Sequence, residues 1–405
     1  MDITATNKSF TNWLIALRRH FHQHPEVSYS EVETQKKLML ELSMLGIENY
    51  KIAGTGVIGT IKGGKKGKTI AIRADMDALK IHEKGTSLNA SYISQNDGIM
   101  HACGHDGHMS IVMGAARLLQ ENRNHLNGNV RLIFQPAEEV PPGGAVKVIE
   151  EGGLNGVDSI LGLHLFPNYN SGDICMKEGP MMASNCKFEI IITGKSGHHF
   201  NAEACIDPIA IGAEFITIIR NAISTSLPES AKYVFETGTL HGGDQFNQIP
   251  DNLSISGSYR VLDVGFLTII EQTLKQALDQ LMQKYKKENL GDFPKYELAI
   301  TTGYPVLVNN PKYTKAAVNI LRKHYKRVTE NIKPVMASDD FAYYLQKIPG
   351  TFLFIGTRNP QKGLVNELHS NCFDIDEHVL LAGTKVLCLL VSNFLEKPSD
   401  YLQNH

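Results

Sequence analysis

The segment MHACGHDGHMS, residues 100–110, gives the strongest local indication of metal chemistry in this sequence. It brings Cys103, His105, Asp106 and His108 together immediately before a predicted helix. Thiolate and imidazole are good ligands for zinc and other late first-row ions. Cys103 and His105 are two residues apart, so in extended backbone their side chains fall on the same side. Taken alone, the segment fits a glycine-rich turn with surface histidines equally well.

A second motif, QPAEE, follows a predicted strand and ends in the paired acids Glu138 and Glu139. Paired acids at a strand end suit a division of work. One binds a metal, and the other takes a proton from metal-bound water. For two adjacent glutamates alone, a solvated acidic loop would be the better interpretation.

Three weaker motifs each have a simple structural explanation. In GLHLFP, His164 lies inside an apolar strand, where a histidine is more often a satisfied core residue than a ligand. In ELHSNCF, His369 lies just ahead of the predicted C-terminal helix, where Ser370 could act as a cap. In RADMDAL, Asp75 and Asp77 follow a predicted strand, where acids can belong to a turn or a cap.

The motifs share a position relative to the predicted strands. The residues at or just past the C-terminal ends of predicted parallel strands are Asp75, Asp77, Glu138, Glu139 and His164. In open α/β sheets, ligands bind at that edge. Five independent structural explanations would not be expected to converge on one edge, so the placement favours a functional site.

Strands and helices alternate in the outer parts of the chain, which indicates an α/β domain with a mostly parallel central sheet flanked by helices. Between about 183 and 302 the order becomes βαββαβ, typical of a small sheet with both helices on one face. We therefore predict a catalytic metal-binding domain of 1–182 and 303–405, interrupted by an inserted lid domain of 183–302. Helices are expected at 31–45, 107–121, 206–224, 264–286, 311–325 and 376–395, and strands at 56–62, 69–73, 129–134, 159–165, 187–193, 233–240, 252–261, 296–302 and 351–355.

The composition is that of an ordinary soluble globular protein. A length of 405 residues favours two domains, and the chain is 42% hydrophobic and 20% charged. A net charge of −2 gives no argument for nucleic acid or an anionic membrane as a partner. No stretch is read as a signal peptide or as reaching the length of a membrane span. Six cysteines without a CxxC pair suggest a reducing cytoplasm.

In their order along the chain, these motifs resemble those of the metallopeptidase-like amidohydrolases. That family includes aminoacylases, hippurate hydrolases, plant indole-3-acetyl-amino-acid hydrolases and bacterial N-acetyl-diaminopimelate deacetylases. The resemblance covers nearly the whole chain, from LRRHFHQHPEVSYSEVET (17–34) to ELHSNCF. It also includes GKSGH, IDPI, GTLHGGDQFNQIPD and SDDF. So many ordered motifs make chance a poor explanation.

The resemblance implies a role for each motif residue. The implied metal ligands are Cys103, His105, Glu139, His164 and His369. They would hold two divalent ions per subunit, which could be Zn, Mn, Ni or Co, with Cys103 as the bridging group. Glu138 matches the general base, and Asp77 matches the acid that orients His105. Asp75 is not counted as a ligand.

The resemblance also implies substrate contacts in the lid and a homodimer formed through it. His198 matches a histidine that reaches the partner subunit's site and polarises the scissile carbonyl. Asn247 matches a residue that contacts substrate near the hinge. Arg260 matches an arginine that binds the free α-carboxylate as a bidentate pair. From the residues alone, His198 could be a turn residue after Gly197, and Arg260 an exposed strand residue.

The chain departs from the family's pattern at several positions. His199 and Phe200 stand where two alanines are usual, and Ala202 and Glu203 stand where a Pro-His pair is usual. These positions concern the acyl pocket and the lid contacts. Asp339 stands where a glutamate is usual, so its carboxylate reaches one methylene less far.

The expected reaction is hydrolysis of the amide bond of a small-molecule N-acyl amino acid by metal-activated water, with Glu138 as general base. A dipeptidase or carboxypeptidase of the same architecture is an alternative, although no acid to hold a free substrate amine is identified. A non-catalytic acyl-amino-acid-binding protein would have no need of Glu138. A structural zinc site would need four closed ligands, whereas this set offers five and an unligated acid. The acyl group and the amino-acid side chain stay open.

Overall fold

The computed structural model describes residues 4–291 and 294–402, and the chain divides into two compact units. The first unit comprises Met1–Met181, Leu307–Lys333 and Asp339–His405, and the second comprises Met182–Val306 and Pro334–Ser338. The predicted catalytic domain includes Pro334–Ser338, which in the structure belongs to the second unit. This segment groups with the second unit because the Ala183 amide donates to the Val335 carbonyl at 3.2 Å and to the Ala337 carbonyl at 2.9 Å.

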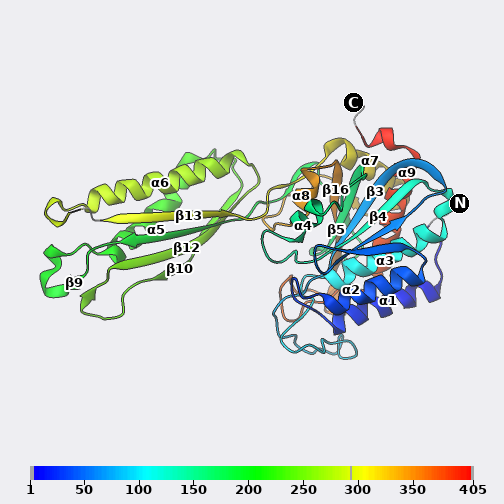
Figure 1. The fold of residues 1–405 in the computed structure, drawn as a ribbon, viewed down its shortest axis with the longest axis horizontal. Coiled ribbons are helices and arrows are strands. Elements are labelled where there is room, and N and C mark those ends of the chain that lie inside the picture. The colour runs from blue at the N-terminus through cyan, green and yellow to red at the C-terminus, as the bar shows by residue number, and fades with distance from the viewer. Residues whose placement is uncertain (1–3, 292–293, 403–405) are drawn as a thin grey trace. The chain divides into compact units, whose positions relative to one another are not determined.

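Among the described residues, the first unit contains an eight-stranded sheet (Figure 1) in the order β1-β2-β4-β3-β5-β16-β6-β15. These strands are β1 (Glu48–Ile52), β2 (Gly56–Ile61), β3 (Lys65–Asp75), β4 (Asn127–Gln135), β5 (Ser159–Asn170), β6 (Ile174–Cys175), β15 (Val328–Thr329) and β16 (Gly350–Arg358). The central strands β4, β3, β5 and β16 are parallel, as predicted. The pairs β1–β2, β2–β4 and β16–β6 are antiparallel, so the sheet is mixed at its edges. Between β1 and β2 the loop is residues 53–55, and so short a connection joins antiparallel strands.

The central strands present alternate residues to two different faces. On β3, Ile72 belongs to the main hydrophobic core, whereas Arg73 and Asp75 lie on the opposite face. The main core also receives side chains from α1 (Lys8–Gln23), α2 (Val32–Met44), α3 (His105–Glu121), α7 (Pro311–His324) and α9 (His378–Glu396). On the other face, a side chain at Gly162 would meet Phe341 of α8 (Phe341–Leu345) at 2.7 Å, so this helix packs closely there. The unit also contains α4 (Gly144–Glu150) and the paired strands β7 (Gly179–Met182) and β14 (Leu307–Asn309).

Helix α9 is the described helix that is long and apolar enough to cross a membrane, by length and composition alone. The expectation that no stretch reaches that length was therefore wrong for this helix. Most of it is buried, and Val379, Leu387 and Phe394 belong to the main core. A helix that is covered on most sides needs apolar residues around most of its surface, which accounts for its composition.

In the second unit, a four-stranded antiparallel sheet has the order β10-β12-β8-β13 (Figure 1). The strands of this sheet and its two helices occur along the chain in the order β8 (Cys186–Thr193), α5 (Pro208–Ser226), β10 (Tyr233–His241), β12 (Asn252–Val261), α6 (Gly265–Tyr285) and β13 (Lys295–Thr302). A separate short antiparallel pair is formed by β9 (Gly197–His198) and β11 (Gln248–Ile249). Alternate residues of β8, from Cys186 to Ile192, are buried in a core shared with α5 and α6. Helix α5 begins at the IDPI motif. There the Asp207 side chain accepts from the Ile209 amide at 2.8 Å and Pro208 occupies the first turn.

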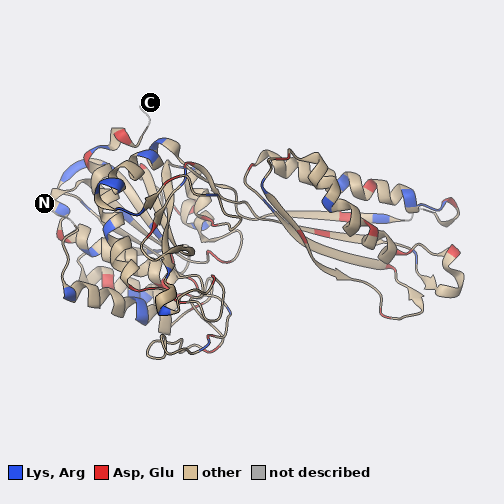
Figure 2. Ribbon diagram, turned by 180° about the vertical axis from the view of Figure 1, so that it is seen from behind, with Lys and Arg blue, Asp and Glu red and all other residues tan. Residues whose placement is uncertain are grey.

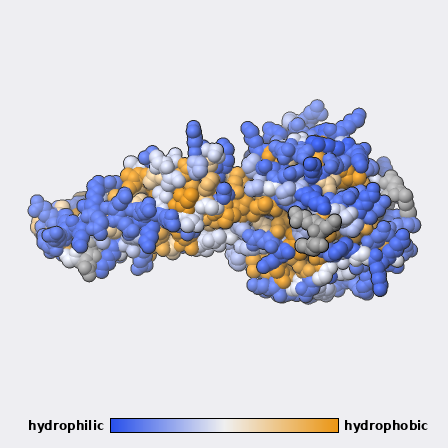
Figure 3. Space-filling view, turned by 90° about the horizontal axis from the view of Figure 1, so that it is seen from above, coloured by the Kyte–Doolittle hydropathy of each residue, from blue (hydrophilic) through white to orange (hydrophobic). Residues whose placement is uncertain are grey.

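Charged and hydrophobic side chains are distributed over both units. Lys and Arg are interspersed with Asp and Glu (Figure 2), in keeping with the net charge of −2. Hydrophilic side chains cover most of the face in Figure 3, with smaller hydrophobic areas on both units. Exposed apolar surface of this kind is ordinary in globular proteins, so the buried polar clusters are the more informative feature.

Candidate metal centre

The five metal ligands expected from the sequence lie together in the first unit. Their ligand atoms form two overlapping groups, and within each group the atoms lie within 4.8 Å of one another. One group consists of Cys103, His105 and His164, and the other consists of Cys103, Glu139 and His369. Cys103 belongs to both groups, which is the position that a bridging thiolate requires.

The backbone at the start of α3 brings two of these ligands together. Gly104 has a φ of +85°, a left-handed conformation that glycine adopts without steric cost. It lies between Cys103, the last residue of the incoming loop, and His105, the first residue of α3. The glycine of this motif therefore lets both side chains reach one place.

His164 lies inside β5, which continues to Asn170, and not at the strand end that the sequence analysis expected. Strand β3 pairs with β5 only from Ser159 to Gly162 of β5. The two strands have therefore separated at the position of His164, and the ligand group lies at this separation.

His369 joins the group from the segment between β16 and α9. Its backbone has a φ of +62°, and its amide donates to the Ala102 carbonyl at 2.9 Å. Its Nε2 lies 3.4 Å from Oε1 of Glu139. Ser370 does not cap α9, whose N-cap is Glu377, so the structural alternative considered for this motif does not apply.

His105 and His164 both hold Nδ1 against a backbone carbonyl. Nδ1 of His105 lies 2.8 Å from the carbonyl oxygen of Asp77, and Nδ1 of His164 lies 2.8 Å from that of Leu165. Because a carbonyl oxygen can only accept, Nδ1 carries a proton in each ring and Nε2 remains for the ligand group. Metal-binding histidines are commonly oriented in this way.

Two buried polar atoms of the group have no hydrogen-bond partner among the described residues. They are Nε2 of His105 and Oε1 of Glu139, which lie 3.9 Å apart. A buried polar atom without a partner costs roughly 1–3 kcal/mol, and a cation beside both would satisfy them together. One thiol, three imidazoles and one carboxylate suit Zn, Mn, Ni or Co. The residues present therefore fit divalent metal ions.

The pKa values of two candidate ligands, Cys103 and His105, are both raised in the protein. Burial and the charge of Glu139 raise the pKa of the Cys103 thiol well above its usual range. Burial alone lowers the pKa of His105, but Asp75 and Asp77 outweigh it and raise the pKa to about 10. A divalent ion bound by these residues would supply a larger local charge and would favour the deprotonated ligands.

Asp77 fixes several parts of the centre at once. Its Oδ1 accepts from the Glu138 amide at 3.0 Å, and its Oδ2 accepts from the Glu139 amide at 3.0 Å and the Ser28 hydroxyl at 2.6 Å. Its carbonyl also holds Nδ1 of His105. One residue therefore sets the positions of both acids of QPAEE and of one imidazole.

Glu138 is 6% exposed and lies in a group of acids with Asp339 and Asp340. Burial, followed by the charges of Asp339 and Glu139, raises the pKa of Glu138 well above its usual range. Asp339 is itself buried, and its Oδ1 lies 3.3 Å from Nη2 of Arg73. Aspartate at this position, although shorter than the glutamate usual in the family, therefore forms a buried ion pair with Arg73.

A buried polar chain behind the ligand group was not foreseen from the sequence. Arg73 donates to Asp75 at 2.6 Å and to Asp340 at 2.7 Å. Asp75 lies 2.6 Å from Nδ1 of His108, whose Nε2 accepts from the Leu165 amide at 2.9 Å. Both nitrogens of His108 are thus committed to protein partners. The alternation of side chains along a strand could have indicated this pairing, because it places Arg73 and Asp75 on the same face.

Asp106, the other acid of the first motif, pairs with α1. Its Oδ2 accepts from Nε of Arg18 and lies beside Nδ1 of His22, both at 2.7 Å. Nε2 of His22 lies 3.0 Å from Glu83. Burial and Arg18 lower the pKa of His22, but Asp106 and Glu83 outweigh them and raise it to about 9.

His22 is expected to make the first unit less stable at alkaline pH. Its pKa is about 9 in the folded chain and about 6.5 in an unfolded one, so its contribution is fully present below pH 6.5 and is lost as pH rises through 9. The shift corresponds to about 3 kcal/mol. Urea unfolding at pH 6.5 and pH 9 should show this loss in the wild type and not in His22→Gln. Equal pH dependence in both proteins would contradict the prediction, and exposed His125→Gln serves as the control.

The residues expected to contact substrate lie in the second unit. Nε2 of His198 lies 3.4 Å from Nδ2 of Asn247, across the short pair β9–β11. Arg260, on β12, donates from Nη1 to the Met336 carbonyl at 3.0 Å and to the Ser338 hydroxyl at 3.3 Å. Within this unit the structure brings His198 and Asn247 together and places Arg260 against Pro334–Ser338.

The departures from the family pattern directly follow His198. Residues His199–Ala204 form a short 3-10 segment, and the Phe200 amide donates to Nδ1 of His198 at 3.4 Å. The Phe200 side chain is 85% exposed. A large aromatic side chain therefore projects to solvent within two residues of the predicted carbonyl-polarising histidine.

The chain is similar over most of its length to known proteins. Residues 71–393 match the model of peptidase family M20/M25/M40. The chain is 37% identical over 393 residues to thermostable carboxypeptidase 1 of Saccharolobus solfataricus, with 96% of this chain and 97% of the relative covered. It is 36% identical over 393 residues to N-acetylcysteine deacetylase of Bacillus subtilis, with 96% and 99% covered.

A solved structure supports the same conclusion. The YXEP protein of Bacillus subtilis, described as a dinuclear metal binding peptidase from the M20 family, superposes with a TM-score of 0.83 at 35% identity. The match covers 96% of this chain and 99% of that one. The resemblance drawn from the motifs is confirmed, and the chain has the fold of a metal-dependent hydrolase.

Proposed function

This chain belongs to peptidase family M20/M25/M40, and on that premise we propose that it hydrolyses the amide bond of N-acyl amino acids. The observation that carries the proposal is the group of Cys103, His105, Glu139, His164 and His369, with the buried acid Glu138 beside it. The group offers ligands for two ions. Glu138 is the neighbouring acid that the proposal leaves for proton transfer.

In this proposal the protein's own groups have the following roles. Bound divalent ions would supply a Lewis acid that activates water and polarises the amide carbonyl. Glu138 accepts a proton from the attacking water and delivers it to the leaving nitrogen. Asp77 holds the backbone amide of Glu138 and so fixes the point from which this side chain extends.

The second unit supplies substrate contacts in this proposal. His198 would act in the partner subunit's site, where it would donate a hydrogen bond to the developing oxyanion, and Asn247 would contact the substrate near the hinge. Arg260 binds the free α-carboxylate through a bidentate pair. We further propose a homodimer formed through this unit, which sedimentation of the full chain would test.

A second candidate substrate is the C-terminal peptide bond. The names of the relatives divide between a deacetylase of an N-acetyl amino acid and a carboxypeptidase. Both reactions break an amide bond beside a free α-carboxylate, so one arginine at this position would serve either. The two differ in what lies on the acyl side of the bond.

A substrate panel separates these functions. Metal-stripped protein is reloaded with Zn, Mn, Ni or Co and given N-acetyl and N-benzoyl amino acids, their α-amides, and N-blocked dipeptides. We expect release of free amine from the N-acyl amino acids and little from their α-amides. Faster cleavage of the dipeptides would favour the carboxypeptidase. Binding without cleavage under every metal would indicate a non-catalytic acyl-amino-acid-binding protein.

A further inference from the structure

His369 is the most exposed of the five candidate ligands, with a side-chain exposure of 51%. It belongs to segment 366–377, which contains no described helix or strand between η4 (Pro360–Lys362) and α9. Cys103, His105 and His164, by contrast, are buried. A ligand on an irregular segment holds a metal ion tightly only when neighbouring contacts fix its position.

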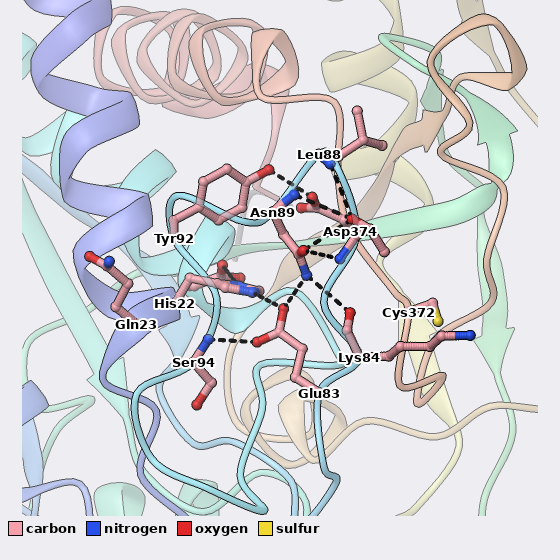
Figure 4. Close-up of polar contacts among 12 residues, drawn as sticks. His22, Gln23, Glu83, Lys84, Leu88, Asn89, Tyr92, Ser94, Cys372 and Asp374 are labelled. Atoms are coloured by element: carbon pink, nitrogen blue, oxygen red, sulfur yellow. Dashed lines mark hydrogen bonds and ion pairs between the residues drawn. The ribbon is translucent and has the colours of Figure 1, made fainter.

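Asp374 ties this segment to α1 and to the loop that contains Tyr92. Its Oδ1 accepts from Nη2 of Arg18 at 2.8 Å and from the Ile375 amide at 2.8 Å. Its Oδ2 accepts from the Tyr92 hydroxyl at 2.8 Å (Figure 4). Both oxygens of Asp374 are therefore committed, and hydrogen bonds to a charged group are the stronger kind.

The loop of residues 83–94 is itself held in place. Glu83 accepts from Nδ2 of Asn89 and from the Ser94 amide, both at 2.7 Å, and lies beside His22 (Figure 4). This loop also contacts the His369 segment directly, because the Lys84 amide donates to the Asn371 carbonyl at 2.8 Å. Tyr92 thus donates from a fixed loop and not from a freely moving one.

Buried side chains and a backbone hydrogen bond fix the chain between Asp374 and His369. Phe373 and Ile375, on either side of Asp374, are 1% and 2% exposed and belong to the main core. The Phe373 amide donates to the Ser370 carbonyl at 3.0 Å, closing a turn next to His369. The chain between the anchored acid and the ligand is therefore short and internally bonded.

We propose that Asp374 and Tyr92 are positioning residues for His369, and through it for one of two metal ions. The ion concerned is the one that Cys103, Glu139 and His369 would hold, and the inference rests on the proposed metal centre. In the other ligand group, His105 and His164 lie on α3 and β5 and not on this segment. Loss of the anchor therefore weakens one metal equivalent and leaves the other unchanged.

The test is a metal titration of stripped, full-length protein with Co²⁺ against a competing chelator. Tyr92→Phe removes one hydroxyl and keeps the ring against Arg18, whose Cζ lies 5.1 Å from the ring centroid. Tyr401→Phe is the matched control, since it removes another buried tyrosine hydroxyl, bonded to Asn393 at 2.6 Å. Asp374→Asn is the second variant.

We expect the wild type and Tyr401→Phe to bind two equivalents. In Tyr92→Phe and Asp374→Asn, the ion held by Cys103, Glu139 and His369 should bind ~10–100-fold more weakly. The affinity for the other ion should be unchanged. In a His369→Ala background, Tyr92→Phe should add no further loss, because the two changes act on one ion. If both variants kept the wild-type affinity for the ion at His369, or bound both ions equally more weakly, Asp374 and Tyr92 would not be positioning residues. The proposed metal centre would still stand. A wild type that binds no metal would overturn the proposed function and this inference together.

Discussion

Replacing Glu138 by glutamine is expected to lower kcat by roughly 10²–10⁴-fold on an N-acyl amino acid while the protein still binds metal. Glutamine has nearly the same shape, so it fits the buried position, but its amide cannot take a proton from water. The change also removes one charge from a group of acids that includes Asp339 and Asp340. Folding should therefore not suffer. The measurement is kcat and metal content for the wild type and the variant side by side.

The control for this prediction is Glu151→Gln, which removes the same charge from an exposed glutamate that accepts from the Ala53 amide. It should keep full turnover. If Glu138→Gln retained wild-type kcat with metal bound, Glu138 would not be the base. If activity fell only because metal was lost, Glu138 would have to be counted as a ligand.

Replacing Cys103 by alanine is expected to reduce the affinity of the protein for both metal ions and to bring activity to the background rate. Cys103 is the residue shared by the two ligand groups, so its loss removes one ligand from each. Losing any of the other four ligands should affect mainly one equivalent. The measurement is metal content after dialysis, together with hydrolysis in the presence of added Zn, Mn, Ni or Co.

Cys388→Ala is the matched control, because it removes another fully buried thiol of the first unit, on α9. It leaves a small cavity in the core but no change at the ligand group, so two equivalents should still bind. Retention of both equivalents by Cys103→Ala would rule out a bridging thiol. Loss of one equivalent would place Cys103 in one group alone.

Strand periodicity and motif placement were sufficient to predict the central part of the fold. The apolar runs that form β3, β4 and β5 are parallel strands, and Asp75 and Glu138 lie at or just beyond two of them. The sequence could not show that β1 and β2 turn back antiparallel, because that depends on a short loop more than on apolar pattern. The place of His164 was also misjudged, since β5 continues well past it.

The supporting contacts of the site were beyond prediction for a different reason. His108 and Asp106 stand in the same motif as the ligands and have suitable side chains, yet one binds Asp75 and the other binds Arg18. Which histidine or acid faces the ligand group depends on residues distant in sequence. Helix periodicity narrows the choice, but the partners are set by tertiary packing, which a single sequence does not reveal.

The most direct test of the metal centre is a crystal structure of protein loaded with Zn²⁺, with anomalous scattering recorded at the zinc edge. We expect two anomalous peaks in the first unit, each about 2.0–2.3 Å from its ligand atoms, with Sγ of Cys103 between them. Glu138 should lie beside the peaks without binding either ion directly. A single peak, or peaks that leave Cys103 and His164 unbound, would contradict a two-ion centre bridged by Cys103.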